Sequence, residues 1–240
     1  MRTSASNLRS GAILEDHDHD WHQLIYVAAG VVRVSTEMGS WVAPPTWAIW
    51  VPAGVRHGLR FLGEGALRTA YFRPEWRAGY PSACAVVSVT PLLRELIVRA
   101  TEVGMLDRRD PTEKALAMLV VAELRQSDAP PFRLPQPVSE ALSRATVLMA
   151  TRAVEAASVA TLAHAVGMGT RTFERRFFAE TGMTPGRWRQ QKALLGGLEQ
   201  IAGGMPVKAA AAQAGYATSS AFIAAFRSSF DTTPGRYFAL

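Results

Sequence analysis

The chain has 240 residues, 48% of them hydrophobic and 19% charged, and a formal net charge of +6, a composition typical of a globular protein with room for two modest domains. It contains no apolar run long enough to span a membrane, and its first residues lack the continuous apolar segment of a secretory signal. A single cysteine, Cys84, excludes an internal disulfide, so we expect a cytoplasmic protein with no membrane partner.

Short apolar runs follow one another between residues 24 and 72, and glycine or proline separates them. They read LIYVAAG, VVRVSTEMG, SWVAPP, WAIWVPAG, HGLRFLGEG and ALRTAYFRP. Runs that are this short, regularly spaced and rich in β-branched and aromatic residues are typical of a small β-barrel or sandwich. We assign residues 1–88 to this domain.

Helical spacing replaces the strand pattern near Thr90. A Thr-Pro step there opens a helix that places Leu93 and Ile97 on one face, and DRRDPTEK opens a second helix. The apolar faces of these helices could form a homodimer or pack onto the chain's own β domain. Four prolines in residues 127–137 predict a stiff linker, so residues 89–137 are interpreted as a helical connector.

Residues 138–240 are expected to be helical throughout. Ser158 is predicted to cap one helix, and Thr184 followed by Pro185 to start a long one, because proline suits the first helical turn. This segment has 11 Lys and Arg against 6 Asp and Glu, whereas residues 1–137 have 15 against 14. Nearly all the excess positive charge therefore lies in the helical segment, as a module that binds a polyanion requires.

One local pattern occurs twice in the helical segment. FERRFFAETGMTPGRW and FIAAFRSSFDTTPGRY begin 49 residues apart, and each belongs to a unit of helix, glycine turn and second helix. This order predicts two helix-turn-helix units, whose second helices are of a size to enter the DNA major groove. Pairs of phenylalanines four residues apart predict the buried face of each second helix: Phe173 with Phe177, and Phe222 with Phe226.

Residues 138–240 resemble the DNA-binding domain of the AraC/XylS family of transcription regulators. The resemblance rests on LAHAVGMGTRTFERRFFAETGMTPGRW in the first unit and AAAQAGYATSSAFIAAFRSSFDTTPGRY in the second. It implies an α+β protein whose C-terminal all-α domain has two helix-turn-helix units joined by one long helix, about residues 185–202. Such a linker helix would set two recognition helices in successive major grooves of double-stranded DNA.

The resemblance also implies which side chains meet DNA. They are Thr170, Arg171, Glu174 and Arg175 in the first unit and Ser219, Ser220 and Arg227 in the second. Arginine can bind guanine with two hydrogen bonds and glutamate can accept one from cytosine, so we expect the first unit to read most of the sequence. The arginines could instead contact phosphates or remain solvated. Gly196 and Gly197 weaken the linker helix by about 1 kcal/mol each relative to alanine, which favours an adjustable angle between the units.

The N-terminal domain resembles a cupin barrel. His17-x-His19 followed by Gln23 resembles the first cupin motif, and the sequence PAGVRH ending at His57 resembles the second. In metal-binding cupins these positions hold one metal ion, and three imidazoles would suit Zn²⁺, Ni²⁺ or Cu²⁺. Gln23 stands where the family has glutamate, and an amide is a poorer ligand, so a polar cluster without metal is the alternative.

Aromatic residues concentrate in the same domain. A barrel of this size can hold one small ligand, and Tyr26, Trp50 and Tyr71 are our candidates to line a site for a small-molecule effector.

Together these patterns predict a sequence-specific DNA-binding transcription regulator whose barrel senses a small molecule or a metal. Members of the family that the chain resembles usually activate transcription, and an activator would also contact RNA polymerase. The alternative is a metal-dependent cupin enzyme with a basic helical appendage. That reading requires a carboxylate where Gln23 stands and leaves the repeated unit unexplained.

Overall fold

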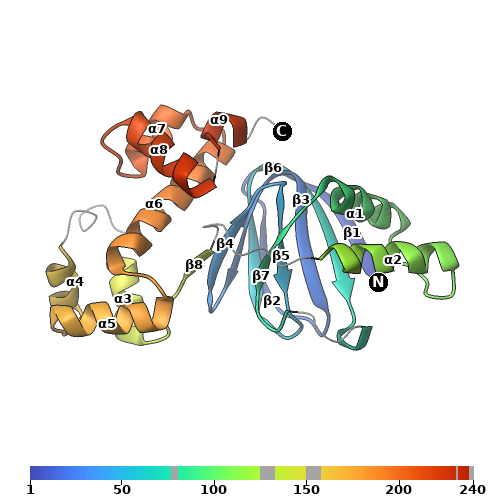
Figure 1. Ribbon diagram of the computed structural model, residues 1–240, viewed down its shortest axis with the longest axis horizontal. Helices are drawn as coiled ribbons and strands as arrows, with labels where there is room; N and C mark the ends of the chain where they lie inside the picture. The colour runs from blue at the N-terminus through green and yellow to red at the C-terminus, as the bar shows by residue number, and fades with distance from the viewer. Residues whose placement is uncertain (77–80, 125–132, 150–157, 231, 238–240) are drawn as a thin grey trace. The chain divides into compact units, whose positions relative to one another are not determined.

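The chain divides into two units in the computed structural model, which describes residues 1–76, 81–124, 133–149, 158–230 and 232–237 (Figure 1). The first unit comprises residues 1–36 and 41–132, and the second comprises residues 37–40 and 133–240. The division falls inside the predicted linker, of which residues 127–132 lie outside the described residues. No described helix is long and apolar enough to cross a membrane.

A sheet forms the centre of the first unit, as predicted. Its strands are β1 (Arg2–Leu8), β2 (Ile13–His17), β3 (His22–Thr36), β4 (Gly39–Ala43), β5 (Trp47–Val51), β6 (His57–Phe72) and β7 (Ala85–Ser88). Strand β6 pairs antiparallel with β1, β2 and β3, and β5 lies between β3 and β7. β3 also pairs with β4. A short 3-10 helix, η1 (Pro74–Trp76), follows β6.

The two central strands are longer than the sequence runs suggested. β3 and β6 pair from His22 opposite Phe72 to Thr36 opposite His57, with register shifts near Ala29. Gly30 lies at this irregularity with φ +79°, and a Cβ there would collide with a backbone carbonyl of β6. The glycine therefore produces a bulge within one strand, where the sequence pattern indicated a break between two.

Two helices, α1 (Pro91–Val103) and α2 (Pro111–Glu123), cover one face of this sheet (Figure 1). Thr90 and Asp110 cap them, each accepting hydrogen bonds from backbone N–H groups of the first turn. Both helices contribute to one core with residues of β3, β5 and β6: Leu24, Tyr26, Ala48, Trp50, Ala70, Phe72, Leu93, Ile97, Ala100, Ala117, Val120 and Val121. The face carrying Leu93 and Ile97 thus packs onto the chain's own sheet.

From Arg133 onward, the described part of the second unit is helical apart from the short strand β8 (Arg133–Pro135). Its helices are α3 (Glu140–Leu148), α4 (Val159–Ala165), α5 (Thr170–Thr181), α6 (Pro185–Ala202), α7 (Val207–Gln213), α8 (Ser219–Phe230) and α9 (Pro234–Tyr237). Ser158 caps α4 and Thr184 caps α6, because each side chain accepts a hydrogen bond from the third residue beyond it. The helix starts predicted at both residues are confirmed.

The repeated pattern forms two helix-turn-helix units on either side of α6 in sequence. α4 and α5 are joined at Gly167 (φ +73°), and α7 and α8 at Gly215 (φ +84°). The four phenylalanines predicted to be buried are 0% exposed: Phe173, Phe177, Phe222 and Phe226. The ring of Phe177 meets Trp188 of α6 edge to face, with ring centroids 6.1 Å apart. Each recognition helix is thus held by an aromatic face, which leaves its other side to solvent.

Helix α6 runs without interruption through the two glycines that were expected to weaken it. A Cβ on Gly197 would lie 2.6 Å from a ring atom of Phe222, whereas one on Gly196 would meet nothing within 4 Å. Gly197 therefore permits close packing between α6 and α8, and only Gly196 is free of that constraint.

Candidate functional site

Helix α5 presents the residues predicted to read DNA on one exposed face. Thr170, Arg171, Glu174 and Arg175 are all exposed. They follow helical spacing, so the glutamate and both arginines lie on a common side, away from the buried pair Phe173 and Phe177. Two guanidinium groups and one carboxylate can therefore reach the same ligand, as recognition of base edges requires.

Helix α8 presents a different chemistry at the matching positions. Ser219 is half-buried, while Ser220 and Arg227 are exposed. Between them, Ile223 is half-buried and Ala224 is exposed. This face offers hydroxyls, two apolar side chains and one guanidinium.

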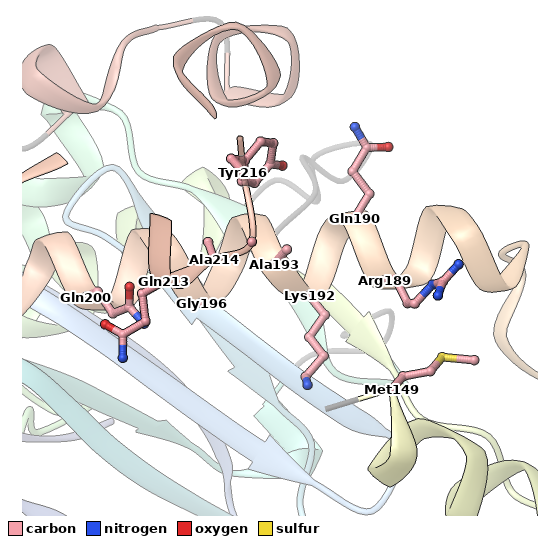
Figure 2. Close-up of a pocket in the computed structure, with 11 residues that line it drawn as sticks. Met149, Arg189, Gln190, Lys192, Ala193, Gly196, Gln200, Gln213, Ala214 and Tyr216 are labelled. Atoms are coloured by element: carbon pink, nitrogen blue, oxygen red, sulfur yellow. The ribbon is translucent and has the colours of Figure 1, made fainter. Parts of the chain in front are cut away.

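A groove of about 690 Å³ lies in the second unit along α6 (Figure 2). Its lining comes from α6, the end of α3 and the turn between α7 and α8: Met149, Arg189, Gln190, Lys192, Ala193, Gly196, Gln200, Gln213, Ala214, Gly215 and Tyr216. Burial raises the pKa of the Tyr216 hydroxyl, which has no hydrogen-bond partner among the described residues. Arg189 and Lys192 make the groove a cationic surface next to the turn that leads into α8.

Three histidines of the first unit meet at one point, as the sequence predicted. His17 is the last residue of β2, and strand pairing places it opposite His57, the first residue of β6. His19 comes from the segment after β2, so the two histidines of the first motif do not lie on one strand. Among the described residues these are the only group of three with metal-ligand character, and their ligand atoms lie within 4.8 Å of one another. His57 is fully buried.

Gln23 of β3 faces this cluster through its carbonyl oxygen. The Thr69 hydroxyl donates to the Leu24 carbonyl at 3.0 Å, so it accepts a hydrogen bond from Gln23 Nε2, also at 3.0 Å. The Tyr71 hydroxyl lies 3.1 Å from the same nitrogen. Since these contacts fix the amide, Gln23 Oε1 points at the imidazoles, 3.0 Å from His19 Nε2 and 2.8 Å from His57 Nε2.

This arrangement surrounds His57 with two acceptors. Its Nδ1 lies 2.8 Å from the Val55 carbonyl oxygen and its Nε2 lies 2.8 Å from Gln23 Oε1. A neutral imidazole has one N–H and can serve only one of them. Burial lowers the pKa of His57 and nearby His17 and His19 lower it further, although the Val55 hydrogen bond opposes the shift. A neutral ring therefore directs the lone pair of one nitrogen at a carbonyl oxygen: Nε2 at Gln23 Oε1 if Nδ1 carries the proton, or Nδ1 at the Val55 oxygen if Nε2 does.

A cation at this point would be coordinated by the lone pairs of both His57 Nε2 and Gln23 Oε1. Zn²⁺ takes imidazole nitrogens at about 2.0–2.1 Å in a tetrahedral arrangement, which puts neighbouring ligand atoms about 3.4 Å apart. The ligand atoms that the described residues offer to a metal are three imidazole nitrogens and one amide oxygen. His19 Nδ1 is buried without a hydrogen-bond partner in the described part of the chain. The residues fit a divalent transition metal, with Gln23 as its weakest ligand.

His22 lies apart from this cluster. Its Nδ1 accepts a hydrogen bond from the Ala53 backbone N–H at 3.1 Å, and its ring centroid is 5.1 Å from that of Trp50. Thr69, by contrast, orients Gln23 and was missed. Its place two residues before Tyr71 on a strand was the available signal, because such residues share a face.

The structure separates the three residues proposed to line an effector site. Tyr26 and Trp50 are fully buried in the core beneath α1 and α2. Tyr71 lies on the opposite face of the sheet, where its hydroxyl contacts Gln23 and its ring lies 5.4 Å from that of His19. Of the three, only Tyr71 adjoins the histidine cluster, because neighbouring positions along a strand alternate between faces.

Comparison with known proteins matches both units. Residues 12–135 match a family described as AraC-like ligand binding domain, and residues 162–239 match a helix-turn-helix domain. The HTH-type transcriptional regulator NimR of Escherichia coli (strain K12) is 30% identical over 223 residues, which are 93% of this chain and 81% of NimR.

Solved structures similar to this chain include ToxT from Vibrio cholerae O395, with a TM-score of 0.41 and 10% identity over 99% of this chain and 96% of ToxT. The DNA-binding domain of AdpA in complex with a target DNA has a TM-score of 0.38 and 27% identity, covering 42% of this chain and 92% of that domain.

A matched ligand-binding domain spans about half of the chain, a matched helix-turn-helix domain follows it, and NimR aligns with most of the sequence. The chain belongs to the AraC family of DNA-binding transcription regulators.

Proposed function

We propose that the first unit binds a divalent transition metal at His17, His19, Gln23 and His57, and that this binding controls how the second unit occupies a promoter. The observation that carries the proposal is the convergence of three imidazoles at a partly buried point, where those of His19 and His57 lie within hydrogen-bond distance of the Gln23 carbonyl oxygen. His57 faces two acceptors there, although its neutral ring has only one N–H. As an activator the protein would also contact RNA polymerase. A small-molecule effector at the same site, next to Tyr71, is the alternative.

In this proposal the metal supplies a positive charge shared by the four ligands. Those ligands belong to separate elements: His17 ends β2, Gln23 lies near the start of β3, and His57 begins β6. Holding them together would fix the relative positions of the three strands. The amide of Gln23 carries no charge and cannot take a proton from a substrate as a carboxylate can, so the site is suited to sensing.

The metal proposal is tested by His17→Ala combined with His57→Ala, with His22→Ala as the matched control outside the cluster. We expect protein purified without an affinity tag to contain Zn²⁺, Ni²⁺ or Cu²⁺, and a chelator to change its affinity for promoter DNA. The double variant should lack both properties, and the control should keep both. If the double variant still responds to the chelator, the ions act elsewhere. If the wild-type protein binds no metal, only the small-molecule version remains.

We further propose that Arg171, Glu174 and Arg175 of α5 select the DNA sequence, with Thr170 beside them, and that Ser219, Ser220 and Arg227 of α8 mainly contact the backbone. Support comes from the exposed, common face of the α5 residues. Each bidentate contact between arginine and guanine distinguishes bases by about 1–3 kcal/mol. The serines of α8 have single hydroxyls, which discriminate less.

Reversing both charges, Arg171→Glu with Arg175→Glu, should abolish preference for a selected site over a scrambled duplex, a loss of roughly 100-fold or more. The matched control is Arg94→Glu with Arg99→Glu, which changes net charge equally on exposed positions of α1 in the other unit. The affinities of both double variants for the selected and the scrambled duplex are measured by fluorescence anisotropy at one fixed salt concentration. Equal preference in the two double variants would contradict the assignment.

A further inference from the structure

Phe178 is the large apolar side chain that α5 leaves exposed. Its side chain is 56% exposed, although the two other phenylalanines of the same helix, Phe173 and Phe177, are fully buried. Residues advance about 100° around a helix, so Phe178 falls between Glu174 and Arg171 in angular position. Phe178 therefore lies within the face proposed to read DNA, on the side away from the core.

The repeat shows that the fold does not require an aromatic residue there. Phe173 and Phe177 have their counterparts in Phe222 and Phe226 of α8, which are equally buried. The counterpart of Phe178, 49 residues further on, is Arg227, which is exposed. A position that holds phenylalanine in one copy and arginine in the other is a surface position, and its side chain is available for a ligand.

The major groove contains one apolar group that such a side chain can recognise. Thymine carries a methyl group at C5, whereas the other edges in the groove present hydrogen-bond donors and acceptors. The neighbours of Phe178 on the helix are charged and suit those polar edges. We propose that Phe178 packs against the C5-methyl group of a thymine and makes α5 selective for thymine at one base pair. This inference rests on the proposed function, in which α5 lies in the major groove.

Helix geometry indicates where this thymine lies. Phe178 follows Arg175 by three residues, which is about 4.5 Å along the helix axis at 1.5 Å per residue. Successive bases on one strand are about 3.4 Å apart. The thymine therefore neighbours the base contacted by Arg175, within one or two steps.

The test begins with duplexes selected from random sequence by the full-length protein. Each thymine of the selected site is then replaced in turn by deoxyuridine, which lacks only the methyl group. For the wild-type protein one replacement near the Arg175 base should weaken binding about fourfold, the effect of losing one buried methyl contact. Phe178→Ala should bind the unmodified site about fourfold more weakly or worse, and should no longer respond to that replacement.

Two further variants separate a DNA contact from a general effect. Phe178→Leu retains an apolar side chain and should keep part of the response to deoxyuridine. Val147→Ala alters a residue of α3 that is 65% exposed and outside this face, and it should behave like wild type. Because Phe178 is exposed, thermal unfolding should be unchanged in all three variants.

The inference is overturned if Phe178→Ala binds the selected site with wild-type affinity and shows the wild-type response at every thymine. Phe178 would then contact another protein or have no role in DNA binding. If the wild-type protein selects no sequence at all, the proposed function fails and the inference fails with it. Selection of a sequence that contains no thymine near the Arg175 base would overturn the inference alone.

Discussion

Glu180, at the end of α5, holds the start of α3. Its Oε2 accepts hydrogen bonds from the backbone N–H groups of Val138 at 3.0 Å and Ser139 at 2.8 Å, and its side chain is 20% exposed. Burial alone would raise the pKa of Glu180, but the hydrogen bonds from Ser139 and Val138 and the nearby Arg176 outweigh it and lower the pKa. The carboxylate thus replaces the cap that the Ser139 side chain does not provide.

We expect Glu180→Gln to reduce the free energy of unfolding by about 1 kcal/mol at neutral pH, since the amide keeps the geometry and loses the charge. A carboxyl whose pKa is lower in the folded state stabilises the fold above its unfolded pKa of about 4.3, and loses that contribution as the pH falls through the folded value. The difference between wild type and variant should therefore shrink below about pH 4.3. Urea unfolding followed by helical circular dichroism at several pH values measures it.

The control for this prediction is Glu140→Gln. Glu140 is 89% exposed and is paired with Arg144 at 2.9 Å on the surface of α3. An exposed pair of this kind contributes little, so the control should match wild type at every pH. A gap for Glu180→Gln that stays constant down to pH 3 would show that the carboxylate charge contributes nothing.

The sequence identified the members of the histidine cluster but not the way in which it is assembled. The residue types and spacing of the cupin motifs pointed to His17, His19, Gln23 and His57. Their meeting depends on β2 pairing with β6, a contact between distant residues that local pattern does not encode. The effector candidates failed to converge for a related reason: which face of a strand is covered depends on where α1 and α2 dock.

Among the elements, α6 contains two adjacent glycines that differ in the space available for a side chain. Alanine in place of glycine within a helix stabilises by up to about 1 kcal/mol when space allows. Gly196→Ala meets that condition and should raise stability, because nothing lies within 4 Å of the added carbon. Gly197→Ala would press on the buried ring of Phe222 at 2.6 Å, and overpacking of this kind costs about 1–3 kcal/mol.

Substitutions at adjacent positions should therefore shift the urea midpoint of the helical unit in opposite directions. The Gly197 variant should also bind DNA more weakly, since Phe222 belongs to α8 and moves with it. If both variants are stabilised, the ring of Phe222 can yield, and the close packing of α6 on α8 is not a constraint.

Element boundaries followed from sequence where local chemistry sets them. Ser158 and Thr184 indicate helix starts in the sequence, because an N-cap is a contact between a side chain and the first turn of the helix that follows it. The strands were less predictable. Gly30 marked a bulge that reads in sequence like a strand end, and β1 was not anticipated since its polar run RTSASNL lacks an apolar alternation.

For the whole molecule, the proposal makes metal and DNA two ligands of one protein, and their effects must be reciprocal. If metal bound at the histidine cluster changes the affinity for promoter DNA by some factor, DNA must change the affinity for metal by the same factor. Couplings between sites are typically about 5–150-fold, which is large enough to measure from both sides.

We expect metal titrations with and without the selected duplex to give affinities that differ by the factor seen when DNA is titrated with and without metal. A scrambled duplex at equal concentration is the control, because contacts to phosphate alone do not report occupation of the specific site. The combined variant His17→Ala with His57→Ala should show a factor of one. Equal factors would place the histidine cluster and the recognition helices in one thermodynamic cycle. A metal affinity that is the same with and without DNA would mean that the cluster acts only within the first unit.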